Sequence, residues 1–146
     1  MALVKLNQEE MRTFLNQTTP ALIGVVGTFG EDGFPHLVPV WYRYDGERFH
    51  VWTLETRTWV RNITRDNRVG FSVHETEGGG TRGFSAKGHA QITTSDGDWV
   101  TQEIRRLTLR YISDRAQVEP YIHRWRQLRT IVSITPQRVS AWRDAD

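Results

Sequence analysis

The sequence predicts an α+β fold in which a mostly antiparallel sheet curls into a small barrel with flanking helices. Three observations indicate this class. The hydrophobic period changes from helical to strand-like after Pro20. Turn signals then separate six or seven short apolar segments, and further helical patterns lie among them. At 146 residues and 17.0 kDa, the chain has the size of a single domain, which we expect to span 1–146.

The N-terminal segment has the pattern of an amphipathic helix over residues 8–17. Asn7 is a suitable N-cap, and Glu10 lies three residues on, as a capping box requires. The apolar side chains of this helix share one face: Met11, Phe14 and Leu15.

Three strands joined by short loops follow this helix. The alternating pattern predicts them at residues 21–28, 34–44 and 48–53. A Gly-Glu-Asp-Gly turn at 30–33 separates the first two, and Asp45-Gly46 is a strong hairpin signal between the last two.

The middle of the chain contains a short helix over 56–65 and strands over 68–75 and 83–93. The glycine run at 78–80 is expected to be a flexible loop between these strands. Gly88, inside the second of them, predicts a bulge or a close approach of two backbones.

The C-terminal third continues with helices and ends in strands. Asp96 can cap a helix over 96–111, and a second helical piece covers 115–128. Two short strands, 130–134 and 138–142, lie on either side of a proline. The whole chain is therefore expected to hold six or seven strands and three or four helices.

The composition excludes several classes of protein. The formal net charge is +2, and the 17 arginines, two lysines and absent cysteines leave few groups that titrate below the pI of about 9.3. The high pI therefore does not indicate a strongly positive surface. A histone-like polycation, a disulfide-stapled secreted module and cysteine-ligated zinc are all excluded.

Membrane and secretion signals are also missing from the sequence. No apolar run approaches the roughly 18 residues of a membrane span, and residues 1–7 lack a signal-peptide pattern. We therefore expect a soluble, cytoplasmic protein with no membrane partner.

Metal and nucleophile motifs are not evident. The five histidines have no ligand spacing, so we expect no metal site. No serine occupies a nucleophile elbow, and no phosphate-binding glycine loop follows a strand. The six tryptophans are explained by packing or, alternatively, by a planar ligand between aromatic rings, for which Trp41 and Trp59 are best placed.

The most informative segment lies where the third strand runs into the short helix. Thr53 ends the strand, and Thr56, Arg57 and Thr58 form the first turn of the helix. Free N–H groups, hydroxyls and a guanidinium can converge there on one anion, for which phosphate is the natural candidate. The alternative is an ordinary threonine N-cap with solvated arginines.

Several segments occur in an order that resembles one family. They are Gly33–Tyr42, Tyr44–Glu47, Thr53 with Arg57, Val60–Val69, Lys87–Ala90, Ile134–Val139 and Trp142. Together they cover nearly the whole chain and are similar to the split-barrel flavin and deazaflavin oxidoreductases, the relatives of pyridoxamine 5'-phosphate oxidase. True pyridoxamine phosphate oxidases are longer and carry a C-terminal substrate-phosphate motif that is not found here.

The resemblance implies a split barrel that forms a homodimer with FMN or deazaflavin (coenzyme F-420) at the subunit interface. The tricyclic ring is expected along the second strand and the phosphate at the strand–helix junction. The expected cofactor-binding residues are Pro39, Val40, Trp41, Thr53, Thr56, Arg57, Thr58, Trp59, Val60 and Arg61.

The resemblance also implies hydride transfer between the cofactor and a small organic substrate. No side chain stands out as a general acid; His36, Tyr42 and His89 are weak candidates. The family often grips the phosphate with an Arg-x-Lys pair, and here Trp59 replaces the lysine. Arg57, Arg61 or an arginine of the partner subunit are the candidates to compensate.

Two alternatives remain at this point. One is a cofactor or haem carrier of the same fold without turnover. The other is a small-barrel module that binds single-stranded nucleic acid by stacking and phosphate contacts. Acidic residues interspersed with the arginines, as in Arg65-Asp66, argue against the second, so we expect no nucleic-acid partner.

Overall fold

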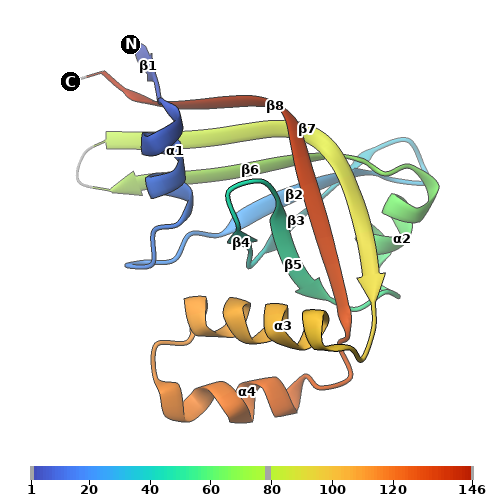
Figure 1. Ribbon diagram of the computed structural model, residues 1–146. Helices are drawn as coiled ribbons and strands as arrows, with labels where there is room; N and C mark the ends of the chain where they lie inside the picture. Colours follow the sequence, from blue (N-terminus) through green and yellow to red (C-terminus); the bar gives the residue numbers. More distant parts are fainter. Residues whose placement is uncertain (1, 78–79, 146) are drawn as a thin grey trace.

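The computed structural model describes residues 2–77 and 80–145, whose strands form one antiparallel sheet (Figure 1). Its strand order is β3-β2-β6-β7-β8-β5-β4, and β1 pairs with β8. With four α-helices among the described residues, this curled sheet is an α+β split barrel, as predicted. The strands are β1 (Leu3–Lys5), β2 (Gly24–Phe29), β3 (Pro35–Val40), β4 (Arg43–Tyr44), β5 (Phe49–Thr53), β6 (Arg68–Glu77), β7 (Gly80–Thr94) and β8 (Thr130–Asp144).

The two longest strands, β7 and β8, run side by side and bend together (Figure 1). Their register shifts between Lys87 and Gly88, and a Cβ on Gly88 would lie 2.1 Å from the Thr135 carbonyl oxygen. The close approach expected at Gly88 is therefore confirmed. Because the irregularity accommodates Pro136, residues 130–144 form one strand instead of the two short strands predicted.

The predicted strand over 34–44 is divided into β3 and β4. The Tyr42 N–H donates to the hydroxyl of Tyr111 at 3.0 Å, so the chain leaves the sheet for two residues. The Asp45-Gly46 hairpin is present between β4 and β5, with Gly46 at a φ of 98°. Of the predicted glycine loop, Gly78 and Gly79 lie outside the described residues, and Gly80 begins β7.

The capping box of the first helix is formed as predicted, with Asn7 and Glu10 each accepting from the other's N–H. The predicted cap Asp96 is wrong, because Gly97 is the N-cap of the third helix. Asp96 instead lies 3.4 Å from Arg129. The helices are α1 (Gln8–Leu15), α2 (Thr58–Arg65), α3 (Asp98–Tyr111) and α4 (Val118–Arg124), with a 3-10 turn at Arg115–Gln117.

Two apolar clusters hold these elements together. The larger one fills the barrel and contains the buried rings of Tyr42, Phe49, Phe71 and Phe84. The smaller one joins α3 to the sheet through Val100, Ile104, Leu107 and Ile131. As a result, α3 and α4 lie as a pair at one end of the barrel, beside β5 (Figure 1).

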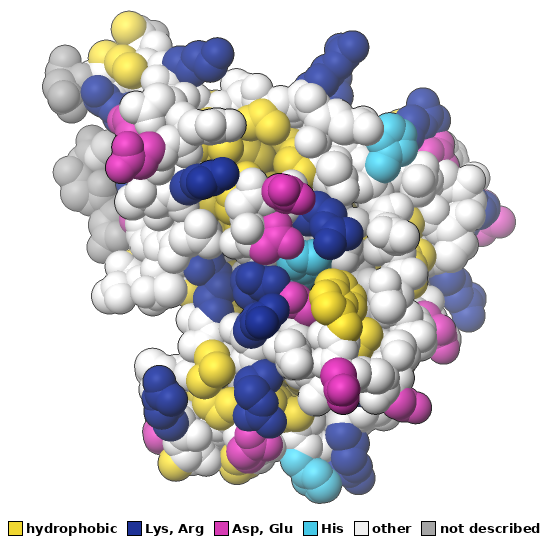
Figure 2. All heavy atoms as spheres, viewed as in Figure 1, with side chains coloured by type: hydrophobic (Ala, Val, Ile, Leu, Met, Phe, Trp, Pro, Cys, Tyr) yellow, Lys and Arg dark blue, Asp and Glu magenta, His cyan; other side chains and the backbone are white. Residues whose placement is uncertain are grey.

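The surface carries charges of both signs. Figure 2 shows Lys and Arg interspersed with Asp and Glu over the face in view, with no uniform basic stripe across it. Among the described residues, no helix is long and apolar enough to cross a membrane.

Candidate functional site

Six of the ten residues predicted to bind a cofactor line one cavity of about 290 Å³, which we call the junction cavity. The C-terminal ends of β3 and β5 and the start of α2 meet there. These segments, which were expected to border one site, lie around the same hollow. The six residues are Pro39, Val40, Trp41, Thr53, Arg57 and Trp59.

The other four predicted residues do not line this cavity. Thr56, Thr58 and Arg61 are exposed around the start of α2. Val60 is buried in the main core, and the N–H groups of Val60 and Arg61 both donate to the Arg57 carbonyl. The N–H groups of Thr58 and Trp59 have no intrahelical acceptor. They belong to the first turn of α2, and no earlier helical turn supplies a carbonyl for them.

The start of α2 is electrostatically suited to an anion. Its N-cap, Arg57, makes no side-chain capping bond, and no acidic residue lies in its first turn. The positive end of the helix and the Arg57 guanidinium are therefore both available beside the cavity. Among the described residues that line the cavity, Arg57 is the one charged side chain.

Trp59 replaces the lysine of the family pattern with an apolar ring. It is 5% exposed and belongs to the main core cluster, so its indole packs beneath the start of α2. The loss of one charge-assisted hydrogen bond is worth about 1.5–3 kcal/mol. Arg57 is consequently the cation that lines the junction cavity at this end of α2.

An aromatic wall completes the cavity; Trp41 was predicted from the sequence, and the residues that pack around it were not. Trp41 stacks on Tyr111, with ring centroids 4.6 Å apart, and on Tyr121, with centroids 5.6 Å apart. Trp52 donates from its indole N–H to the Leu128 carbonyl at 2.7 Å. The wall residues of β5, α3, α4 and the following turn are Trp52, Leu107, Tyr121, Trp125 and Leu128.

These wall residues lie far from the β3 and β5 segments in sequence, so spacing alone could not place them. One local signal was available, because Tyr121 and Trp125 are four residues apart and can share a helix face. That signal indicates a shared face without indicating what the face covers.

The weak candidates for a general acid do not lie in the junction cavity. Tyr42 is fully buried and donates to the Leu15 carbonyl at 2.8 Å, and burial raises its pKa. His36 pairs with Thr28 within the sheet and does not line the cavity, and His89 lines another. Tyr121 lines the junction cavity, and burial raises its pKa, so its hydroxyl stays protonated at neutral pH.

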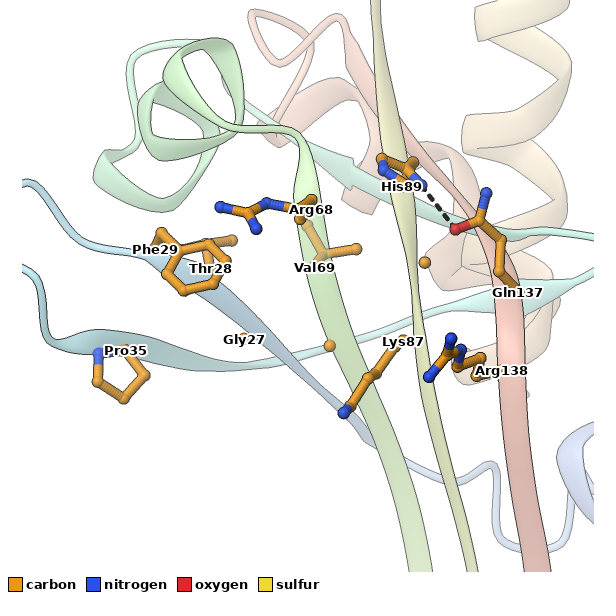
Figure 3. A pocket seen from close by; sticks show the side chains of 12 residues that line it. Gly27, Thr28, Phe29, Pro35, Arg68, Val69, Lys87, His89, Gln137 and Arg138 are labelled. Atoms are coloured by element: carbon orange, nitrogen blue, oxygen red, sulfur yellow. Dashed lines mark hydrogen bonds between the residues drawn. The ribbon is translucent and has the colours of Figure 1, made fainter.

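A second cavity, of about 530 Å³, lies on the outer face of the sheet (Figure 3). We call it the sheet cavity. Its lining residues come from β2, β3, β6, β7 and β8, and none of them lines the junction cavity. Arg68, Lys87 and Arg138 give it a basic rim, and His89 also lines it.

Comparison with known families agrees with this architecture. The sequence model of the pyridoxamine 5'-phosphate oxidase family matches residues 8–143. The chain belongs to the pyridoxamine 5'-phosphate oxidase family. The match includes every predicted cofactor-binding residue and both cavities, whereas no curated protein matches the chain significantly.

Solved structures share the fold of this family member. A conserved hypothetical protein from Mycobacterium tuberculosis is 26% identical, with a TM-score of 0.78 over 94% of this chain and 84% of that one. A FAD-binding protein from Mesorhizobium loti is 18% identical, with a TM-score of 0.68 over 100% and 99% of the two chains. An F420 reductase is 23% identical, with a TM-score of 0.61 over 82% and 89%.

Proposed function

We propose that this family member is a flavin- or deazaflavin-dependent oxidoreductase that holds FMN or coenzyme F-420 in the junction cavity. The observation that carries the proposal is the convergence of three features on one hollow: the uncapped start of α2, the Arg57 guanidinium and an aromatic wall. The FAD-binding protein and the F420 reductase of the same fold support this cofactor class.

The chain's own residues have separable roles in this proposal. Arg57 and the N–H groups of Thr58 and Trp59 would hold the cofactor phosphate. Pro39 and Trp41 would border the ring, and the apolar wall would exclude water from it. A bound flavin or deazaflavin would supply the hydride-transfer chemistry toward a small organic substrate.

We further propose that the site is completed by a second copy of the chain. The junction cavity, at about 290 Å³, is at the small end of the roughly 300–1,000 Å³ of ligand pockets. One subunit therefore encloses only part of a cofactor the size of FMN. Phe34 and Leu37 are 74% and 66% exposed on and beside the edge strand β3, where they offer an apolar contact to a partner.

Titration of the purified protein with FMN and with coenzyme F-420 tests the cofactor proposal. Trp41, Trp52, Trp59 and Trp125 line the cavity, so binding should quench tryptophan fluorescence and shift the visible absorption band of the cofactor. A saturable change with one of the two supports the proposal. A protein that ignores both cofactors and instead retards a single-stranded oligonucleotide in a gel would contradict it.

A cofactor carrier without turnover is the second candidate function. It is favoured by one observation: among the described residues that line the junction cavity there is no carboxylate and no histidine. Reoxidation of the chemically reduced, protein-bound cofactor by a panel of quinones, enones and nitroarenes separates the two. An oxidoreductase should accelerate at least one acceptor over free cofactor, and a carrier should accelerate none.

A further inference from the structure

The sheet cavity is built from two neighbouring rows of residues that cross the sheet. Its first row follows the strand register from Gly27 on β2 to Gly70 on β6, Lys87 on β7 and Arg138 on β8. Figure 3 shows Lys87 extending from β7 toward β6 and β2, and Arg138 extending from β8 beside β7. The row therefore has two glycines at one end, which we call the glycine floor, and two cationic residues at the other.

The glycine floor is open to a ligand. A Cβ at Gly70 would have no neighbour closer than 3.9 Å, and one at Gly27 would meet only the Leu37 side chain, at 3.2 Å. No side chain therefore lies over Gly70, and the Leu37 side chain borders the floor at Gly27. A flat molecule can lie directly on such a surface.

The second row supplies a stacking ring and polar groups. Phe29 borders the floor, and the Arg68 guanidinium lies 4.8 Å from the centre of its ring. Arg68 also holds the Asp66 carboxylate through both of its oxygens, so that carboxylate is already neutralised. His89 and Gln137 are joined by a 2.7 Å hydrogen bond at the rim.

Lys87 and Arg138 form a like-charge pair that lacks a counter-ion. They are exposed and directly opposite across β7 and β8, an arrangement that destabilises a sheet. Within residues 2–77 and 80–145, neither makes an ion pair, and no carboxylate lines the cavity. An anion between the two cations would remove this repulsion.

We propose that the sheet cavity binds a small planar ring compound that carries a phosphate or carboxylate group. The anion lies between Lys87 and Arg138, whose guanidinium can grip two oxygens at once. The ring lies on the Gly27–Gly70 floor and stacks beside Phe29. The cavity volume of about 530 Å³ is within the range of small-molecule sites.

Isothermal titration calorimetry with AMP and with benzoate tests the proposal and distinguishes the two anion sources. At least one of these probes should bind saturably, whereas adenosine, which lacks the anion, and inorganic phosphate, which lacks the ring, should bind at least tenfold more weakly. The Lys87→Gln/Arg138→Gln double variant should weaken the bound probe at least tenfold and keep the wild-type circular dichroism spectrum.

The Arg57→Ala variant is the matched control, because it removes a cation from the junction cavity instead. It should leave probe binding unchanged, and the double variant should leave cofactor titration unchanged. The proposal is overturned if neither probe binds, or if Arg57→Ala abolishes probe binding. It is also overturned if the double variant changes the oligomeric mass and not the probe affinity, since a partner carboxylate would then be the counter-ion.

Discussion

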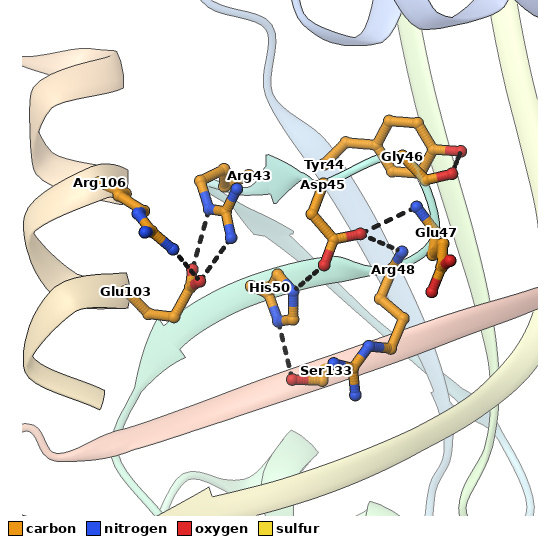
Figure 4. Close-up of polar contacts among 10 residues, drawn as sticks. All are labelled: Arg43, Tyr44, Asp45, Gly46, Glu47, Arg48, His50, Glu103, Arg106 and Ser133. Carbon is orange, nitrogen blue, oxygen red and sulfur yellow. Dashed lines mark hydrogen bonds and ion pairs between the residues drawn. The ribbon is translucent and has the colours of Figure 1, made fainter. Parts of the chain in front are cut away.

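Two polar networks fix the elements around the junction cavity (Figure 4). Glu103 of α3 is 1% exposed and pairs with Arg43 of β4 through both oxygens and with Arg106 on its own helix. On the neighbouring hairpin, His50 bridges Asp45 and Ser133, with 2.8 Å to each. Apart from the exposed Arg106, these side chains are buried or half-buried, and none of them lines the junction cavity, so their role is to hold α3 and the β4–β5 turn in position.

The variant Glu103→Ala should destabilise the fold by about 3 kcal/mol, because it leaves Arg43 half-buried without its partner. Urea denaturation measures the loss. Glu119→Ala is the matched control, since that residue pairs with Arg105 on the exposed surface, where an ion pair contributes little. Equal midpoints for the two variants would show that the buried pair does not anchor α3.

The stability of the fold should depend on Asp45 in acid. Partial burial alone would raise the pKa of Asp45, but hydrogen bonds from the Arg48 N–H, His50 and the Glu47 N–H lower it from 3.8 to about 2. Since the folded pKa lies below the unfolded one, this stabilisation is present above about pH 4 and is lost as the pH falls through about 2.

The variant Asp45→Asn should therefore be less stable than the wild type at pH 6, and the difference should shrink between pH 4 and pH 2. Urea midpoints across this pH range give the comparison. A difference that is constant with pH would mean that the Asp45 charge does not contribute to stability.

At the scale of elements, the bend of β7 and β8 depends on Gly88. The variant Gly88→Ala places a methyl group against the Thr135 carbonyl and should cost about 3 kcal/mol or more, because backbone must shift. Gly70→Ala is the control on the neighbouring strand, where the nearest atom would be 3.9 Å away. Thermal unfolding of both variants tests the bend; similar losses would contradict its dependence on Gly88.

The elements also show how far sequence reasoning reaches. The α1 capping box, the Asp45-Gly46 hairpin and the close approach at Gly88 depend on local residue chemistry and were predicted. The division of β3 from β4 was missed because the Tyr42 N–H bonds to Tyr111, 69 residues away. The helix cap at Gly97 was missed because it has no side chain to signal it.

The same distinction applies to the junction cavity. The strand–helix segment from Thr53 to Trp59 was identified from hydroxyls and arginine at a helix start, a local pattern. The aromatic wall depends on where the α3–α4 pair packs, which contacts between Leu107 and Ile131 decide. Local pattern therefore identified the strand–helix side of the junction cavity, and tertiary packing supplied its apolar side.

At the scale of the whole molecule, the proposed homodimer makes a joint prediction. Leu37→Glu introduces a charge at a 66% exposed apolar position on the edge strand β3 and should convert a dimer into a monomer. Light scattering after size exclusion measures the mass. If the partner completes the site, cofactor affinity should fall in parallel; a monomer with unchanged affinity would show that one subunit suffices.

The central claim is that the start of α2 binds a cofactor phosphate. Its most direct test compares FMN with riboflavin, which lacks the phosphate, by fluorescence titration of the wild type and Arg57→Ala. We predict that the variant binds FMN at least tenfold more weakly, corresponding to about 1.4 kcal/mol or more, and binds riboflavin as the wild type does. An equal loss for both ligands, or no loss for FMN, would contradict the placement of the phosphate beside Arg57.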